Sequence, residues 1–226
     1  MKIAIVADIH GNSDALQAVL NHLPSVDLLV SAGDVLGYYP FFERCLDLLI
    51  DAGASMIQGN HEAYLTRSAT PRSNALFNWY LKLFERTASK RTMAWLNQLP
   101  PDLLIELPHG LMRVFHGSPW SVDEYVYEED TAQRPFRQIK EDIIVLAHTH
   151  IPMDVIIGNK QILNPGSVGQ PRRGYNGASY ILYDSGKNKP FQHHKVIYDP
   201  NPFISALREM SYEDRFISAF LNWDCQ

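Results

Sequence analysis

Short runs of apolar and β-branched residues recur along the chain with the length and spacing of β-strands. Turn-forming or helix-patterned segments separate them. The runs predict strands at Ile3–Ala7, Leu28–Ser31, Met56–Gln58, Leu103–Leu107, Met112–Phe115, Ile143–Ala147, Val155–Ile157, Gln161–Leu163 and Ser179–Tyr183.

Helical periodicity fills the gaps between the first three runs. Apolar residues from Leu16 to Leu23 predict a helix, which Asn12 or Ser13 caps and Pro24 ends. A second helix is expected over Phe41–Asp51. Because alternating strands and helices imply parallel strands, the first third of the chain is expected to form a βαβαβ unit.

The second half of the chain has mostly strand patterns. His109-Gly110 separates two runs as a hairpin turn does, and Ser185–Asn188 is a turn between two further strand-like runs. There is no internal repeat and no linker-like tract. One α/β domain of mixed sheets is therefore expected over residues 1–226.

Residues 63–100 differ from their surroundings and have the pattern of a helical insert. Helical spacing follows a possible cap at Ser73, and a second helix is expected after Ser89. Six basic residues against Glu85 alone give this segment a net charge of +5. A basic segment on an acidic body can attract an anion, although such a run is more often a solvated face.

Composition limits the classes of function. The 226 residues include 20 basic and 25 acidic side chains, a net charge of −5, which argues against binding to extended nucleic acid or to an anionic membrane. There are two cysteines, Cys45 and Cys225, and no CxxC motif. With no disulfide framework, signal-peptide core or membrane-length apolar run, a cytoplasmic location is expected. No feature identifies a protein partner.

Polar side chains that can bind metals follow five of the predicted strands. The carboxyl ends of strands form the edge at which open α/β sheets build their sites. Five of the nine histidines stand in these strand-end motifs. The motifs are Asp8-Ile9-His10, Gly33-Asp34, Gly59-Asn60-His61-Glu62, His116-Gly117 and His148-Thr149-His150.

Each motif residue alone has an ordinary explanation as a turn former, a cap or a core residue. Independent turns would not concentrate imidazoles, carboxylates and an amide at strand ends in this way. Oxygen and imidazole donors without a thiolate suit Mn, Fe, Co, Ni or Zn better than Ca or Mg. The donors are too many for one ion. Two divalent ions bridged by a carboxylate are therefore expected, an arrangement suited to in-line displacement at phosphorus.

In this order, the five motifs resemble those of the calcineurin-like metallophosphoesterase superfamily. The stretches Asn164–Arg172, Gly33–Tyr38 and His116–Pro119 are similar to its bacterial and archaeal phosphodiesterase branch, which is related to diadenosine tetraphosphate hydrolases. The resemblance covers residues 1 to about 184. It implies an α/β fold, a four-layer α/β/β/α sandwich of two mixed sheets flanked by helices, and a metal-dependent phosphoric ester hydrolase.

Carried over residue by residue, the resemblance implies a dinuclear centre with manganese as the first expectation. The expected ligands are Asp8, His10 and His150 for one ion, Asn60, His116 and His148 for the other, and Asp34 as the bridge. A hydroxide between the ions would attack phosphorus. His61, beside Asn60, is the expected donor of a proton to the leaving oxygen, and Glu62 is expected to orient it.

The loop Asn164–Arg173 is the expected substrate-binding segment. Gly166 and Gly169 would let the backbone approach an anion closely. Ser167, Arg172 and Arg173 are the expected contacts to phosphate oxygens. A plain turn with two exposed arginines is the alternative.

The expected substrate is a phosphorylated small molecule or nucleotide, namely a phosphodiester or a dinucleoside polyphosphate. A serine/threonine-type phosphoprotein phosphatase is an alternative, but those enzymes carry an arginine soon after the second-motif aspartate, where this chain has Gly37-Tyr38-Tyr39. A non-catalytic binding scaffold is another alternative. Scaffolds of this fold lose metal ligands or the histidine after the asparagine, and here none is lost. A nuclease on long DNA would need an extended basic track.

Overall fold

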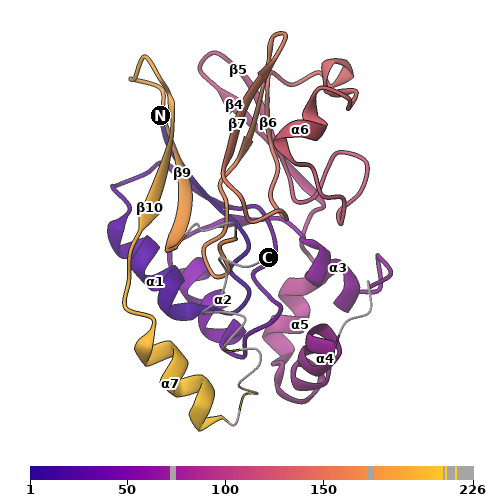
Figure 1. Ribbon diagram of the computed structural model, residues 1–226, viewed down its shortest axis with the longest axis vertical. Helices are drawn as coiled ribbons and strands as arrows, with labels where there is room; N and C mark the ends of the chain where they lie inside the picture. The colour runs from indigo at the N-terminus through magenta and orange to yellow at the C-terminus, as the bar shows by residue number, and fades with distance from the viewer. Residues whose placement is uncertain (72–74, 173–175, 211, 213–216, 218–226) are drawn as a thin grey trace.

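Two five-stranded sheets form the centre of the protein (Figure 1), in the orders β10-β9-β1-β2-β3 and β4-β5-β6-β8-β7. The computed structural model describes residues 1–71, 75–172, 176–210, 212 and 217. The strands are β1 (Lys2–Val6), β2 (Leu28–Ser31), β3 (Ser55–Met56), β4 (Asp102–Leu107), β5 (Gly110–Phe115), β6 (Ile143–Val145), β7 (Met153–Ile157), β8 (Lys160–Asn164), β9 (Ala178–Asp184) and β10 (Phe191–Val196).

Most helices form the lower part of the molecule in Figure 1, whereas α6 lies in the upper part beside the second sheet. The helices are α1 (Ser13–His22), α2 (Phe42–Asp51), α3 (Asn60–Leu65), α4 (Ala75–Thr87), α5 (Lys90–Leu96), α6 (Glu128–Thr131) and α7 (Asn201–Glu209). No helix among the described residues is both long enough and apolar enough to span a bilayer.

Strand β1 is the centre of the first sheet, parallel to β2 and antiparallel to β9. Its side chains alternate between the two faces of the sheet. Ile3 and Ile5 face the second sheet, whereas Ala4 and Val6 pack with residues of α1 and α2. Both faces of β1 are therefore buried, which explains its unbroken apolar sequence.

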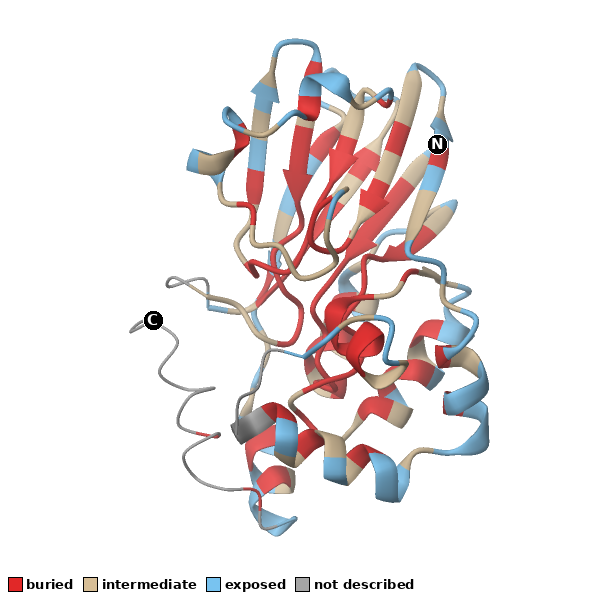
Figure 2. Ribbon diagram, turned by 90° about the vertical axis from the view of Figure 1, so that its right-hand side faces the viewer, coloured by how far each residue is buried: buried red, intermediate tan, exposed pale blue. Residues whose placement is uncertain are grey.

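The layers follow from three groups of buried residues. Ile5 and Val30 pack against Met112 and Val114 of β5 between the two sheets. The outer face of the second sheet packs with the segment around α6, including Phe136. Figure 2 shows the buried residues running along the strands and the exposed ones on the outer sides of the helices. The expected four-layer α/β/β/α sandwich is confirmed, with a fourth layer reduced to a loop, the short helix α6 and a 3₁₀ turn.

The predicted βαβαβ unit and its helix starts are also confirmed. Strands β1, β2 and β3 are parallel, and Asn12 caps α1 by accepting a hydrogen bond from the Ala15 amide at 3.1 Å. Ser89 caps α5 by accepting one from the Thr92 amide at 3.0 Å. Ser73, the other expected cap, lies outside the described residues.

Four elements differ from the sequence-based expectation. Strand β3 spans two residues, and α3 begins at Asn60 where a turn after the strand was expected. Strand β10 was expected only as a run beyond a turn, because its central residues are polar. Helix α7 was not predicted, although Phe203, Ile204 and Leu207 give it one apolar stripe, which packs against Tyr39.

Candidate metal centre

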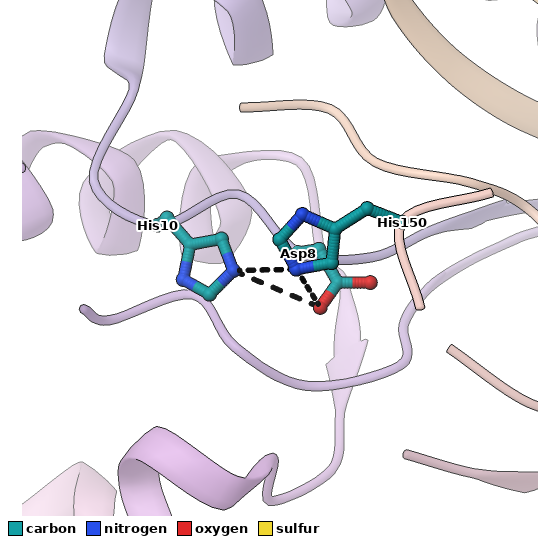
Figure 3. Close-up of side chains that lie close together, drawn as sticks. All are labelled: Asp8, His10 and His150. Atoms are coloured by element: carbon teal, nitrogen blue, oxygen red, sulfur yellow. Dashed lines mark hydrogen bonds and ion pairs between the residues drawn. The ribbon is translucent and has the colours of Figure 1, made fainter. Parts of the chain in front are cut away.

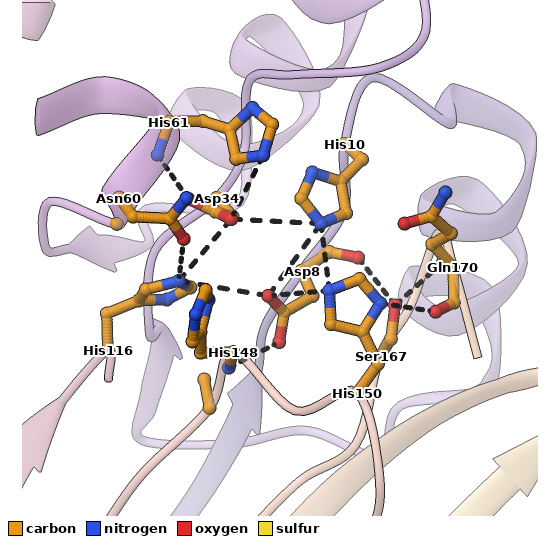
Figure 4. A network of polar contacts seen from close by, with 12 residues as sticks. Asp8, His10, Asp34, Asn60, His61, His116, His148, His150, Ser167 and Gln170 are labelled. Atoms are coloured by element: carbon orange, nitrogen blue, oxygen red, sulfur yellow. Dashed lines mark hydrogen bonds and ion pairs between the residues drawn. The ribbon is translucent and has the colours of Figure 1, made fainter. Parts of the chain in front are cut away.

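All seven expected metal ligands lie together at the carboxyl ends of strands from both sheets (Figure 4). Asp8 and His10 follow β1, and Asp34 follows β2. Each of the seven is buried. The remaining four are Asn60 at the start of α3, His116 after β5, and His148 and His150 after β6.

Five of these residues have left-handed backbone conformations. The φ angles are 53° at Asp8, 52° at His10, 53° at Asp34, 66° at His148 and 62° at His150. Non-glycine residues rarely adopt such angles. Residues that do so are concentrated at functional sites, where the surrounding structure enforces the strained backbone. Each turn thereby aims a polar side chain inward instead of continuing the strand.

Backbone hydrogen bonds hold these turns against one another. The amides of Ile9 and His10 both donate to the carbonyl oxygen of Asp34, at 2.8 and 2.9 Å. The His148 amide donates to Asp8 Oδ2 at 3.1 Å. Gly59 packs directly on Asp34, where an added Cβ would collide with the carboxylate and the amide nitrogen. The first two motifs and the last are thus fixed relative to one another before any ligand binds.

Asp8, His10 and His150 form the first cluster (Figure 3). The two Nε2 atoms lie 3.1 Å apart, and Asp8 Oδ1 lies 3.4 Å from His150 Nε2 and 3.8 Å from His10 Nε2. Donors at about 2.1 Å from one ion are separated by roughly 3.0–3.4 Å in octahedral or tetrahedral geometry. Two of the three separations fall in this range, and the third, between Asp8 and His10, is about 0.4 Å longer, so the three side chains are close to the spacing that a single transition-metal ion needs.

The hydrogen bonds on the far side of each ring show why this cluster needs a cation. His10 Nδ1 lies 3.2 Å from the Leu36 carbonyl oxygen, and His150 Nδ1 lies 2.5 Å from that of Gln170. A carbonyl only accepts, so both Nδ1 atoms donate and both Nε2 atoms present lone pairs to each other. Asp8 Oδ1 is buried and has no hydrogen-bond partner among the described residues. Three lone pairs converge where a positive ion would stabilise them.

Asp34, His116 and His148 form the second cluster. His116 Nε2 lies 3.4 Å from Asp34 Oδ2 and 2.9 Å from Asn60 Oδ1, and its Nδ1 donates to the Ala32 carbonyl oxygen at 2.8 Å. The Nε2 atom of His148 is buried and has no hydrogen-bond partner within the described part of the chain. Asp34 Oδ2 is also 3.8 Å from His10 Nε2, so this one oxygen lies between the two clusters.

Burial and charge set the protonation of the histidines. Burial lowers the pKa of His148 to about 3 and holds those of His10 and His150 well below the usual value, so these rings are neutral and present lone pairs. Burial also acts to lower the pKa of His116, but the Asp34 carboxylate outweighs it and raises that pKa to about 10. A bound ion would take the place of the His116 Nε2 proton.

The two aspartates respond differently to burial. Burial raises the pKa of Asp8 to about 8, because nothing close by fully compensates its charge. Burial would also raise that of Asp34, but His116 and His61 hold the pKa of Asp34 well below its usual range. A bound metal ion would therefore stabilise the charged form of Asp8 more than that of Asp34.

His61 and Glu62, both on α3, have separate surroundings. His61 Nε2 lies 3.9 Å from Asp34 Oδ2, and its Nδ1 is buried, with no hydrogen-bond partner in the part of the chain that the structure describes. The Glu62 carboxylate accepts backbone hydrogen bonds from Asp34 at 2.9 Å, Leu36 at 2.8 Å and Gly59 at 2.8 Å. Glu62 thereby ties the second and third motifs together through their backbones. Its expected role in orienting His61 stays a prediction.

Residues of the expected substrate-binding loop, Asn164–Arg173, also differ in their surroundings. Ser167 is fully buried; its hydroxyl donates to the Asp8 carbonyl oxygen at 2.7 Å and accepts from the Gln170 amide at 2.7 Å. It supports the first-motif turn and is not among the residues that line the cleft. Arg172 does line the cleft above the clusters, whereas Arg173 lies outside the described residues.

A cavity of about 140 Å³ opens over the two clusters and contains residues that no motif indicated. Tyr38 packs on His10 at 4.5 Å and edge-on to His61 at 4.7 Å between ring centroids. Tyr125 stacks on His148 at 4.0 Å. Burial opposes the charge of Arg172, but Tyr38 and Tyr125 beside it raise its pKa above the usual value. Only the position of Tyr38, directly after the second motif, was a signal in the sequence.

Three known proteins are similar to this chain over half of its length or more. An uncharacterised protein of Methanocaldococcus jannaschii is 30% identical over 87% of this chain and 88% of its own length. The crystal structure of a metallophosphoesterase from Sphaerobacter thermophilus is 26% identical, with a TM-score of 0.82 over 98% of this chain and 99% of that one. Serine/threonine-protein phosphatase 1 of Salmonella typhimurium is 30% identical over 50% of this chain and 56% of its own.

The family itself follows from a longer match. A family model described as the calcineurin-like phosphoesterase superfamily domain covers residues 1–188, which include every strand-end motif and the loop through Arg172. The chain belongs to the calcineurin-like phosphoesterase superfamily.

Proposed function

We propose that the protein hydrolyses phosphoric esters with two divalent ions, held by Asp8, His10 and His150 on one side and by Asn60, His116 and His148 on the other. The observation that carries this proposal is the position of Asp34 Oδ2, within 3.4 Å of His116 Nε2 and 3.8 Å of His10 Nε2. One carboxylate oxygen can then serve both clusters. Manganese is the first metal to test, because oxygen and imidazole donors suit it.

The residues around the clusters have distinct roles in this proposal. When bound, the ions neutralise charge on the phosphoryl group and lower the pKa of water. Arg172 binds a non-bridging phosphate oxygen, since its guanidinium lines the same cleft as the clusters. His61 holds a proton for the leaving oxygen; burial lowers its pKa, which makes it a stronger acid when protonated. Tyr38 and Tyr125 narrow the cleft and exclude bulk water.

We propose a phosphodiester or a dinucleoside polyphosphate as substrate and the cytoplasm as the location. The cleft over the clusters, about 140 Å³, accommodates a phosphoryl group but not a whole nucleotide. Gly37-Tyr38-Tyr39 follows the second-motif aspartate in place of the arginine expected of phosphoprotein phosphatases, and Tyr38 packs on His10, which argues against a phosphoprotein substrate. The partial match to a serine/threonine-protein phosphatase keeps that activity as the second candidate.

We also propose that residues 1–226 act as one domain with a helical insert at 63–100. Beyond the family match, Tyr212 donates a hydrogen bond from its hydroxyl to the Tyr38 carbonyl oxygen at 2.6 Å. The same ring packs edge-on to Trp79 of α4 at 4.6 Å between centroids. Tyr212 thus links Trp79 of the insert to Tyr38, which lies beside the clusters.

The experiment is a substrate panel after chelation and reloading with Mn²⁺. It compares bis-p-nitrophenyl phosphate, diadenosine tetraphosphate, p-nitrophenyl phosphate and a phosphoserine peptide, with metal content measured in parallel. We expect close to two ions per chain and the highest kcat/KM on one of the first two compounds. Preference for the peptide would favour the phosphatase. Full metal loading without turnover of any ester would favour a binding scaffold, and absence of metal uptake would overturn the proposal.

A further inference from the structure

A second and larger cavity lies beside the metal cleft. Its volume is about 680 Å³, within the range of roughly 300–1,000 Å³ that binds small organic ligands. It is formed by the end of α3, the segment 69–71, and the helices α4 and α5 of the insert. Tyr64 lines both this cavity and the metal cleft, so the two spaces meet at one side chain.

The walls of this cavity suit a flat organic group. Tyr64 and Phe84 are buried aromatic residues, 8% and 3% exposed, and both line it. Met93, on α5, also lines it and is 40% exposed. An accessible thioether beside aromatic rings is an adaptable apolar surface, which an occupant would cover.

Polar groups occur at the same walls. Arg67 and Glu85 both line the cavity and are exposed to solvent. A guanidinium can attract a further phosphate, and a carboxylate can accept hydrogen bonds from the N–H groups of a heterocycle. Apolar faces with a few polar groups are the usual composition of a small-molecule site.

Helix α3 connects the two spaces. It begins at Asn60, beside the metal clusters, and ends at Leu65, which lines the second cavity. At about 1.5 Å per residue, these positions are roughly 8 Å apart along the helix, a length that a nucleoside monophosphate can span. The Tyr64 hydroxyl donates to Asp123 Oδ2 at 3.2 Å, which anchors the shared wall.

From these observations we infer that the second cavity binds the nucleoside of a nucleotide phosphoester whose phosphorus lies over the metal clusters. The inference rests on the proposed function and adds the chemical class of the group attached to phosphorus. Base and ribose lie against Tyr64 and Phe84, and Arg67 attracts any additional phosphate. The helical insert then selects the substrate, while the strand-end residues carry out the reaction.

The test compares two diesters that share a leaving group, thymidine 5′-(p-nitrophenyl phosphate) and methyl p-nitrophenyl phosphate, on the Mn²⁺-loaded protein. Ala88→Phe places a ring in the cavity, because Ala88 lines it. Thr87→Phe is its matched control, since Thr87 is exposed and does not line the cavity. Arg67→Ala removes the cation at the cavity, and Arg86→Ala removes an exposed cation outside it.

We expect Ala88→Phe to raise KM for the thymidine ester about tenfold, equivalent to about 1.4 kcal/mol, and to leave the methyl ester unchanged. Arg67→Ala should raise the same KM about threefold at low salt and less at high salt. Thr87→Phe and Arg86→Ala should match the unsubstituted protein on both esters. Equal effects on the two esters, or none on either, would overturn the inference.

A binding measurement separates this inference from the proposed function. Calorimetric titration of thymidine 5′-monophosphate into the Mn²⁺-loaded protein requires no turnover, so it reports on the cavity even if neither ester is hydrolysed. Weaker binding to Ala88→Phe but not to Thr87→Phe supports the inference, and equal binding to both contradicts it. If circular dichroism shows that Ala88→Phe does not fold, the same titration compares the surface variants Arg67→Ala and Arg86→Ala. Weaker binding to Arg67→Ala alone then supports the inference, and equal binding to both contradicts it.

Discussion

The cleft over the two clusters and the helical insert are adjacent, but different interactions stabilise each of them. In the cleft, His10, His116 and His150 each have one ring nitrogen bonded to a backbone carbonyl oxygen, so each ring has one orientation. In the insert, Tyr80 and Phe84 pack against Phe42 of α2 through apolar contacts. Directional bonds fix where charges lie, whereas apolar packing fixes a shape. Substitutions in the cleft should therefore affect every substrate, and those in the insert should distinguish between substrates.

The largest expected effect is that of Asp34→Asn. The variant removes the one carboxylate that lies between the two clusters, so we expect loss of both ions and of several kcal/mol of transition-state stabilisation, about a thousandfold in kcat/KM. Elemental analysis and the substrate panel measure the two effects. Asp51→Asn, exposed at the end of α2, is the control. Full metal content with full turnover would contradict the bridging role.

His61→Ala should separate reaction chemistry from metal binding. We expect an unchanged metal content, because His61 is not assigned as a ligand, and about a hundredfold loss of kcat on esters of alkyl alcohols. Esters of p-nitrophenol need little protonation of the leaving oxygen and should lose much less. His109→Ala, on an exposed hairpin, is the control. An equal loss on both kinds of ester would show that His61 positions the phosphoryl group instead.

Arg172→Ala tests binding without chemistry. Loss of a charge-assisted hydrogen bond to phosphate is worth about 1.5–3 kcal/mol, so KM should rise at least tenfold for every phosphoester, with metal content unchanged. Arg172→Lys should restore part of the binding, because lysine keeps the charge but not the bidentate geometry. If both variants keep the original KM, Arg172 does not contact substrate.

Tyr212→Phe should have the smallest effect and act on stability. The variant removes the hydroxyl that donates to the Tyr38 carbonyl oxygen and keeps the ring that packs on Trp79. A hydrogen bond of this kind contributes about 1 kcal/mol, so Tm should fall by about 2–4 °C in a chain of this size. Differential scanning calorimetry measures the shift. A change in metal content would show that the last part of the chain supports the clusters directly.

The fold and the two clusters of candidate metal ligands could be predicted from the sequence because they rest on local signals. The apolar run of β1 is uninterrupted, since both of its faces are buried, and five of the strands end in a polar motif. Residues that meet at one edge of the sheets can therefore be recognised in the sequence by their positions directly after strands. The position of Asp34 between the clusters was expected from the family resemblance, and the geometry supports it.

The surroundings of the site could not be predicted, because they depend on tertiary contacts. Glu62 follows His61 in sequence, but helix α3 turns its carboxylate toward the amides of Leu36 and Gly59. Tyr125 stacks on His148 from a loop with no motif of its own. The second cavity likewise arises only when α3 and the insert pack together, and no residue pattern records its volume.

The left-handed turns at the strand ends have a consequence for the stability of the chain. His10, His148 and His150 occupy backbone conformations that asparagine and glycine tolerate better, at a strain of about 1 kcal/mol or more for each histidine. Replacement of these histidines by asparagine or glycine would relieve that strain. The fold therefore carries a cost in stability at three positions where the backbone aims an imidazole at the same point.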